Sequence, residues 1–252
     1  MKKIVAIINQ KGGVGKSTTA EALLAGLSLK GYKTLAIDLD AQGNLTYSTG
    51  ATTEGATALG ILTGEVKAKE AIQQTKSGDI IASNKALAGA DAFISDTGKE
   101  YRLKEALETI SGDYDYIIID TPPALGILTI NALTACDSVI IPAQADIYSI
   151  QGIEQLAETI KPVRKYCNPN LSIEGILLTR YNSRSILSKE VAELMEQLAE
   201  KLGTKLFKTT IREAIAVKEA QISQESLYSY APRAKVAEDY TNFIEELLKE
   251  KE

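Results

Sequence analysis

Residues 11–18 read Lys-Gly-Gly-Val-Gly-Lys-Ser-Thr and follow an apolar run over residues 4–8 that is typical of a buried parallel strand. Three glycines within four positions let the backbone turn tightly, so that successive N–H groups converge on phosphate oxygens at the positive end of the following helix. Lys16 adds a positive charge for the β- and γ-phosphates, and Ser17 adds a hydroxyl ligand for Mg²⁺. The stretch therefore predicts a strand, a phosphate-binding loop and a helix.

The loop departs from the common phosphate-binding pattern Gly-x-x-x-x-Gly-Lys-Ser/Thr. That pattern requires glycine at position 10, where this chain has Gln10, and a second lysine, Lys11, follows it. The alternative is a glycine-rich turn with a solvated lysine. We favour a variant phosphate-binding loop, because a strand precedes it and helical apolar spacing follows it until Gly31.

Composition limits the classes of protein. The chain has 252 residues, 44% hydrophobic and 24% charged, which suits one large α/β domain spanning residues 1–252. No apolar stretch approaches the ~20 residues that span a bilayer, and the first strand is too short for a signal-peptide core, so we expect a cytoplasmic protein. Histidine is absent, which excludes Ser-His-Asp hydrolysis and His-ligated zinc. Cys136 and Cys167 lack C-x-x-C spacing and are expected to be free thiols.

Charge is unevenly distributed along the chain. The formal net charge is −5, but residues 161–218 hold 11 lysines and arginines against 6 acidic residues, a local charge of +5. This segment either forms a basic face for nucleic acid or carries ordinary solvated lysines on helices, and charge alone leaves both open.

Apolar periodicity predicts alternating strands and helices along the chain. The predicted strands cover residues 34–39, 79–83, 116–120, 138–142 and 171–179, and the predicted helices cover residues 58–62, 99–110, 125–135 and 149–166, with loops elsewhere in residues 41–64. Two further helical stripes are expected to face the core: Leu187, Val191, Leu194, Leu198 and Leu202, then Val236, Tyr240, Phe243, Ile244 and Leu247. Such alternation predicts a mostly parallel sheet flanked by helices on both faces.

Two of the predicted strands end in aspartate, at Asp38-Leu39-Asp40 and at Asp120. An aspartate that ends a buried strand downstream of a phosphate-binding loop can hold a water of the Mg²⁺ shell beside Ser17. Together with the loop, this predicts a nucleoside triphosphatase. The residues predicted to bind nucleotide are Lys11, Gly12, Gly13, Val14, Gly15, Lys16, Ser17 and Thr18.

Three ordered motifs make nearly the whole chain resemble the ParA-type, Soj-like partition ATPases, the deviant-Walker group of P-loop proteins. They are residues 9–18 (Asn-Gln-Lys-Gly-Gly-Val-Gly-Lys-Ser-Thr), residues 38–44 (Asp-Leu-Asp-Ala-Gln-Gly-Asn) and residues 120–134, which begin Asp-Thr-Pro-Pro. The resemblance implies ATP hydrolysis with Mg²⁺ in a homodimer, where Lys11 reaches the phosphates bound by the partner subunit. It also implies that Lys16 binds phosphate in its own subunit.

The same resemblance assigns the acidic residues. Asp40 matches the switch aspartate that orients or activates the attacking water, and Lys11, Lys16 and Asp40 are the implied catalytic residues. Ser17, Asp40 and Asp120 are the implied Mg²⁺ site. Asp38 is expected to support either the metal shell or the loop.

The resemblance further implies sequence-independent DNA binding by the ATP-bound dimer, association with the nucleoid, and stimulation by a ParB-like centromere-binding protein. Arg184 matches a DNA-contacting arginine, and its phosphate contacts would be salt-sensitive. Glu213 and Ala216 occupy positions that are often basic in relatives. Arg212 and Lys218 are therefore expected to substitute as DNA-binding residues.

Two other classes remain as alternatives. A MinD-like positioning ATPase would attach to membranes through a basic amphipathic C-terminal helix, whereas this chain ends in an acid-rich segment, so no membrane contact is expected. A scaffold or filament protein whose assembly is controlled by ATP is the second alternative.

Overall fold

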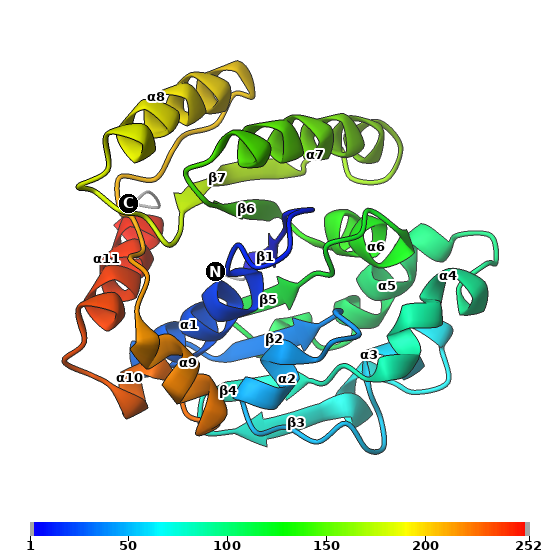
Figure 1. Ribbon diagram of the computed structural model, residues 1–252. Helices are drawn as coiled ribbons and strands as arrows, with labels where there is room; N and C mark the ends of the chain where they lie inside the picture. The colour runs from blue at the N-terminus through cyan, green and yellow to red at the C-terminus, as the bar shows by residue number, and fades with distance from the viewer. Residues whose placement is uncertain (1–2, 250–252) are drawn as a thin grey trace.

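The computed structural model describes residues 3–249, and its centre is a seven-stranded sheet (Figure 1). The strand order is β3-β4-β2-β5-β1-β6-β7, and all neighbouring strands are parallel except β3 and β4. The strands are β1 Lys3–Ile7, β2 Thr34–Asp38, β3 Ile72–Thr75, β4 Gly78–Ile81, β5 Tyr116–Asp120, β6 Ser138–Ala143 and β7 Ser172–Leu178. The prediction of a mostly parallel sheet is confirmed.

Helices cover both faces of the sheet (Figure 1). One face is covered by α1 (Lys16–Leu29), α2 (Asn44–Ser48), α10 (Leu227–Tyr230) and α11 (Lys235–Lys249). The other face is covered by α3 (Ala58–Thr63), α4 (Ala90–Phe93), α5 (Arg102–Glu108), α6 (Ile127–Ala135), α7 (Ile147–Tyr166) and α8 (Ile186–Lys201). Two apolar cores result, one on each side of the sheet. Short 3₁₀ turns lie at η1 Ala68–Ala71, η2 Lys85–Gly89, η3 Lys99–Tyr101 and η4 Ser111–Asp113, and α9 spans Ile215–Ile222.

The register of the central strands brings the functional motifs to one edge. Ile7 pairs with Asp120 between β1 and β5, and Asp38 pairs with Asp120 between β2 and β5. Since parallel strands end at the same edge of a sheet, the loop after β1 lies beside both aspartates. All five residues of β5 are buried, because the strand has neighbours on both sides and helices on both faces.

The two predicted apolar stripes, on α8 and α11, differ in how far they are buried. All five apolar residues of the α11 stripe are buried, and α11 packs against α1, so this prediction is confirmed. The α8 stripe was expected to face the core as a whole, which is wrong for Leu187 and Leu194, whose side chains are 66% and 46% exposed. The reason is that α8 lies over the edge strand β7, which covers only a narrow face including Val191 and Leu198.

Residues 41–98 hold more regular structure than the sequence indicates. The expected helix at residues 58–62 is present as α3, but α2 and the strand β3 are additional. Neither has a recognisable apolar period: α2 has only five residues, and β3 is an edge strand with the sequence Ile-Gln-Gln-Thr. Its antiparallel pairing with β4 comes from a tight hairpin, in which Thr75 pairs with Gly78 at φ +135°.

Two expectations from composition can be checked within the described residues. Cys136 is buried and Cys167 half-buried, and both are free thiols as expected. Between residues 3 and 249, no helix is at once long and apolar enough to cross a membrane.

The contact between α1 and the C-terminal helices contains an unusual acidic group. Glu21 of α1 is 6% exposed, and its Oε1 has no hydrogen-bond partner among the described residues. Burial raises the pKa of Glu21 to about 8, so the folded state holds a proton that the unfolded chain loses near its ordinary pKa of 4.5. Stability is therefore highest below pH 4.5 for this group and falls as the pH rises towards about 8.

We predict that Glu21→Gln stabilises the protein progressively as the pH rises from 5 to 8, with about 1.4 kcal/mol for each pKa unit removed. The amide cannot ionise, so the variant lacks the loss of stability that deprotonation causes in the wild type. Chemical unfolding at several pH values measures the difference. Glu108→Gln, at an exposed position of α5, is the control and should show no such trend. Parallel pH profiles for wild type and Glu21→Gln would contradict the prediction.

Candidate functional site

The loop between β1 and α1 has the backbone geometry of an anion site. Gly13 and Gly15 adopt left-handed φ angles of +73° and +85°, which residues with a Cβ rarely adopt. Gly15 caps α1 without any side-chain hydrogen bond, and the first turn of α1 contains no acidic residue. The first N–H groups of this helix are thus available to an anion, and the helix dipole favours negative charge there.

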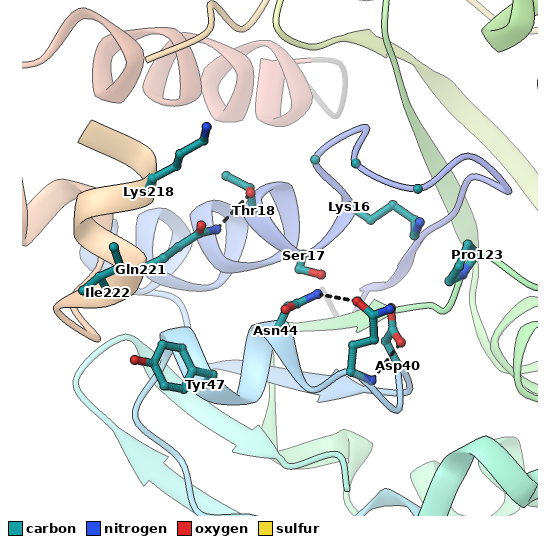
Figure 2. Close-up of a pocket in the computed structure, with 14 residues that line it drawn as sticks. Lys16, Ser17, Thr18, Asp40, Asn44, Tyr47, Pro123, Lys218, Gln221 and Ile222 are labelled. Atoms are coloured by element: carbon teal, nitrogen blue, oxygen red, sulfur yellow. Dashed lines mark hydrogen bonds between the residues drawn. The ribbon is translucent and has the colours of Figure 1, made fainter. Parts of the chain in front are cut away.

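The loop borders a cavity of about 510 Å³ at the carboxyl edge of the sheet (Figure 2). Figure 2 shows Lys16 and Asp40 on one side of the cavity and α9 on the opposite side. The lining residues are Gly12, Gly13, Gly15, Lys16, Ser17, Thr18, Asp40, Gln42, Asn44, Tyr47, Pro123, Lys218, Gln221 and Ile222. Within α9, Gln221 Nε2 donates to Thr18 Oγ1 at 3.1 Å, which joins this helix to the start of α1.

Lys16 is the cation of the cavity. Its side chain is buried, and among residues 3–249 its Nζ donates only to the carbonyl of Lys11, at 3.3 Å. Burial lowers the pKa of Lys16, while the nearby Asp120 and Asp40 carboxylates oppose that shift. The ammonium group therefore lies close to two acids and forms no ion pair with any residue that the structure describes, as a phosphate-binding lysine requires.

The burial of Asp120 is only partly compensated. Both carboxylate oxygens are buried and lack a hydrogen-bond partner among the described residues. Burial and the adjacent Asp38 raise the pKa of Asp120 well above its usual range, despite opposing effects of Ser17 and Lys16. An unpaired buried carboxylate close to a serine hydroxyl fits Mg²⁺, which is usually held by one or two carboxylates together with waters and phosphates. Ser17, Asp120 and Asp40 are therefore the residues that would hold it.

Asp38 supports the loop. Its Oδ2 accepts hydrogen bonds from the Thr46 N–H at 2.9 Å and the Thr46 hydroxyl at 2.7 Å, and its Oδ1 accepts from the Asp40 N–H at 3.0 Å. Burial raises the pKa of Asp38 to about 6, even though these donors favour the charged form. Of the two roles that the sequence left open, the hydrogen bonds favour loop support over metal binding.

Asp40 lies in the turn after β2 and lines the cavity. Its Oδ1 accepts the Gln42 N–H at 3.0 Å, and the residue is 8% exposed. The carboxylate thus faces the space where Lys16 and Ser17 also point (Figure 2). This is the place that a water-orienting acid would need.

Lys11 does not line this cavity. Its Nζ forms an ion pair with Asp146 Oδ2 at 2.5 Å, and both side chains are 31% exposed. Asp146 caps α7 by accepting the Ser149 N–H at 3.0 Å. Burial alone would raise the pKa of Asp146, but the hydrogen bonds from Lys11 and Ser149 lower it. The two predicted phosphate-binding lysines therefore point to different places.

The three predicted DNA-binding residues are not equivalent. Arg184 lies exposed in the loop between β7 and α8. Arg212 is held by Asp239, with N–H···O distances of 2.6 and 2.7 Å, and this pairing raises the pKa of its guanidinium group. Lys218 lies on α9, at the rim of the main cavity. Arg212 and Lys218 also share a second cavity of about 160 Å³ next to the phosphate-binding loop.

Sequence reasoning missed several residues that shape the site. Thr179 donates through its hydroxyl to the Val14 carbonyl at 2.8 Å and so braces the loop from β7. Arg180 adopts φ +49° and pairs with Glu213 across the second cavity. Asp146 and Gln221 carry no motif. Only Asp146 left a signal, because an aspartate shortly after a predicted strand is a common helix cap.

Comparisons with known proteins agree on one family. Residues 2–173 match the family model described as AAA domain. The chain is 41% identical to the sporulation initiation inhibitor protein Soj of Bacillus subtilis, over 98% of each chain. It is 36% identical to the chromosome partitioning protein ParA of Caulobacter vibrioides, over 98% of this chain and 94% of that protein. A solved structure of cobyrinic acid a,c-diamide synthase from Mycobacterium smegmatis, with a bound ATP analogue and magnesium, matches with a TM-score of 0.86 and 34% identity, over 99% of this chain and 95% of the other.

We predict that Asp120→Asn raises the melting temperature of the ligand-free protein by a few degrees, because an amide is less costly to bury beside Asp38. The same variant should lose the part of the ATP-induced stabilisation that depends on Mg²⁺. Thermal unfolding with and without ATP, in Mg²⁺ or in EDTA, measures both effects. Asp113→Asn, at an exposed position before β5, is the control. A Mg²⁺-dependent shift that persists in Asp120→Asn would contradict the assignment.

Proposed function

The chain belongs to the AAA-domain family and, within it, to the Soj and ParA group of chromosome-partitioning ATPases, and we propose that it segregates DNA through an ATP-driven cycle of dimerisation. In this cycle, Mg²⁺ and ATP join two subunits into a dimer that binds DNA without sequence preference. Hydrolysis, stimulated by a ParB-like centromere-binding partner, then releases the dimer, and repeated cycles move or position plasmid or chromosome cargo. The observation that carries the proposal is the convergence of Lys16, Asp40 and Asp120 beside a loop with a second lysine, Lys11.

ATP hydrolysis is the chemistry that this site performs, with Mg²⁺ as cofactor. We assign the loop N–H groups and Lys16 to the phosphates, and Ser17 and Asp120 to the metal. When bound, Mg²⁺ neutralises charge on the phosphate oxygens. Asp40 faces the cavity and is assigned to orient or activate the attacking water. Preorganised groups of this kind stabilise charge as it develops in the transition state.

The proposed dimer joins two copies at the carboxyl edge of the sheet. Lys11 lies outside the cavity of its own subunit, which suits a residue that reaches the phosphates bound by the other copy. Large apolar side chains are exposed along this edge: Tyr47 at 55%, Tyr148 at 71% and Ile222 at 74%. Tyr47 and Ile222 also line the mouth of the cavity. A second subunit placed here would bury them, and burial of apolar surface is the main driving force of association.

The proposed DNA contacts rest mainly on Arg184. Its side chain is exposed and has no ion pair among the described residues, so a DNA phosphate can approach it. Arg212 is already neutralised by Asp239, and its contribution should be smaller. Lys218, at the rim of the nucleotide cavity, is placed where binding of ATP could affect its position. A protein that binds chromosomal DNA in this way is expected on the nucleoid.

The two alternative functions are less well supported. A membrane-positioning role would need a free apolar face on the last helix, but Tyr240, Phe243 and Leu247 of α11 are buried against the core. The acidic end of the chain, residues 250–252, lies outside the described residues. For an ATP-controlled filament we find no specific surface, and light scattering with ATP, with and without DNA, would detect growth beyond the dimer.

The proposed function is tested by the ATPase rate of the protein alone, with plasmid DNA, and with DNA plus the purified product of the adjacent gene. We expect DNA and partner together to stimulate more than the sum of their separate effects. A rate that responds to neither would overturn the partition role while leaving the ATPase assignment intact.

We predict that Lys11→Ala binds ATP with an affinity within a few-fold of wild type but loses hydrolysis and the stable dimer. The reason is that Lys11 is assigned to the phosphates of the partner subunit and not of its own. Fluorescent ATP titration measures binding, and light scattering coupled to gel filtration measures dimerisation. Asp40→Ala is the matched comparison, because it should also lose hydrolysis yet still dimerise with ATP. Lys11→Ala protein that dimerises normally with ATP would contradict the trans role.

For DNA binding, we predict that Arg184→Ala weakens ATP-dependent affinity and reduces the slope of log affinity against log salt concentration by about one. The loss of one phosphate contact releases one counterion fewer. Fluorescence anisotropy with labelled duplex DNA, in an Asp40→Ala background that retains ATP, gives both quantities. Arg233→Ala, at an exposed position before α11, is the control. An unchanged salt slope would remove Arg184 from the DNA-binding surface.

A further inference from the structure

We infer that Ser83 and Thr46 are positioning residues for hydrolysis, which clamp the backbone of Asp40 so that its carboxylate stays aimed at the nucleotide cavity. Neither residue lines that cavity, and neither belongs to the motifs that identify the family. The inference rests on the proposed role of Asp40 in ATP hydrolysis. It assigns a positioning role in that reaction to two residues outside the cavity.

The clamp is a closed circuit of hydrogen bonds. The Ser83 hydroxyl donates to the carbonyl of Asp40, and the Ser83 N–H donates to Thr46 Oγ1 at 2.9 Å. The Thr46 hydroxyl donates to Asp38 Oδ2 at 2.7 Å, and Asp38 Oδ1 accepts the Asp40 N–H at 3.0 Å. Both peptide groups of Asp40 are thereby fixed, one through its N–H and one through its carbonyl.

Three separate elements supply the members of this circuit. Asp38 ends β2, Thr46 lies in α2, and Ser83 follows the neighbouring parallel strand β4. Asp38, Thr46 and Ser83 are almost fully buried, with exposed fractions of 0%, 1% and 0%. In a buried setting each of these hydrogen bonds is costly to leave unmade, so the circuit is expected to hold one conformation.

Two hydrogen bonds within the turn also hold Asp40: the Gln42 N–H donates to its Oδ1 at 3.0 Å, and the Gly43 N–H donates to its carbonyl at 2.8 Å. The turn also borders an open groove of about 830 Å³, lined by residues that include Gln42, Gly43 and Ser83. Gly43 itself is at φ +64°, so the turn also contains a residue with wide conformational freedom. These bonds orient the carboxylate only relative to its own turn, and the clamp ties that turn to β2, α2 and the end of β4.

Hydrolysis is sensitive to such a constraint. A displacement of about 1 Å in a reacting group can cost roughly 100-fold in rate. The loop and Lys16, which are assigned to bind the phosphates, make no hydrogen bond to Ser83 or Thr46. Loss of the clamp should therefore lower kcat and leave KM for ATP nearly unchanged. A merely structural role would instead lower thermal stability without this separation.

The test compares Ser83→Ala and Thr46→Val, which each remove one hydroxyl, with Thr46→Ser, which keeps it. We expect kcat for Mg-ATP hydrolysis to fall roughly 10- to 100-fold in the first two variants, with KM within about two-fold of wild type. Thr46→Ser should restore most of kcat. Fluorescent ATP titration and thermal unfolding are measured on every variant, so that a folding defect is recognised.

Ser48→Ala is the matched control, because Ser48 lies in the same helix, is 3% exposed, and donates its hydroxyl to the Leu45 carbonyl outside the clamp. Wild-type kcat in Ser83→Ala and Thr46→Val would overturn the inference. So would an equal loss of kcat in Ser48→Ala or in Thr46→Ser. Asp40→Ala in the same assay distinguishes failure of the proposed role of Asp40 from failure of the clamp. If Asp40→Ala still hydrolyses ATP, the proposed role of Asp40 fails. If it is inactive while Ser83→Ala is fully active, only the clamp fails.

Discussion

The burial of two carboxylates side by side is the constraint on which the site depends. Asp38 and Asp120 end neighbouring parallel strands and stand opposite each other in register, both fully buried. Two negative charges in such a place disfavour each other and the folded state, unless hydrogen bonds or cations compensate them. The surrounding residues compensate the two carboxylates to different extents.

Asp38 has more hydrogen-bond partners than Asp120, and the two residues therefore have different roles. Asp38 receives three hydrogen bonds from Thr46 and Asp40 and is thereby committed to holding the loop. Asp120 receives none from the described residues and remains free to bind a cation with Ser17. Asp120 and Asp40 are close enough to Lys16 to favour its charged form, yet neither is tied to it by a salt bridge. The ligand-free site thus keeps one carboxylate and one ammonium group without a direct ion pair, which costs stability and prepares the site for Mg-ATP.

The sequence predicted the central sheet well and its periphery poorly, for physical reasons. Strands such as β5 are buried on both faces, so they appear as continuous apolar runs that end in a ligand residue. The edge strand β3 and the short helix α2 leave no such pattern, and α8 buries a narrower stripe than its leucines indicate. At the site, the loop and the aspartates have local signatures. The contacts of Lys11 with Asp146 and of Asp40 with Ser83 have none, because the fold brings together residues that are 135 and 43 positions apart in the chain.

The ion pair with Asp146 holds Lys11 in the ligand-free protein. In the proposed dimer, Lys11 binds the phosphates of the partner subunit instead. About a third of each side chain is exposed, and pairs of this kind contribute only about 0–1 kcal/mol. The pair is therefore strong enough to hold Lys11 away from its own cavity but weak compared with the attraction of a multiply charged triphosphate. Because Asp146 also caps α7 through Ser149, departure of Lys11 leaves that helix start intact. In the proposed dimer, the lysine can then move to the phosphates of the partner subunit without unfolding any element of its own, and its release breaks only this half-buried ion pair.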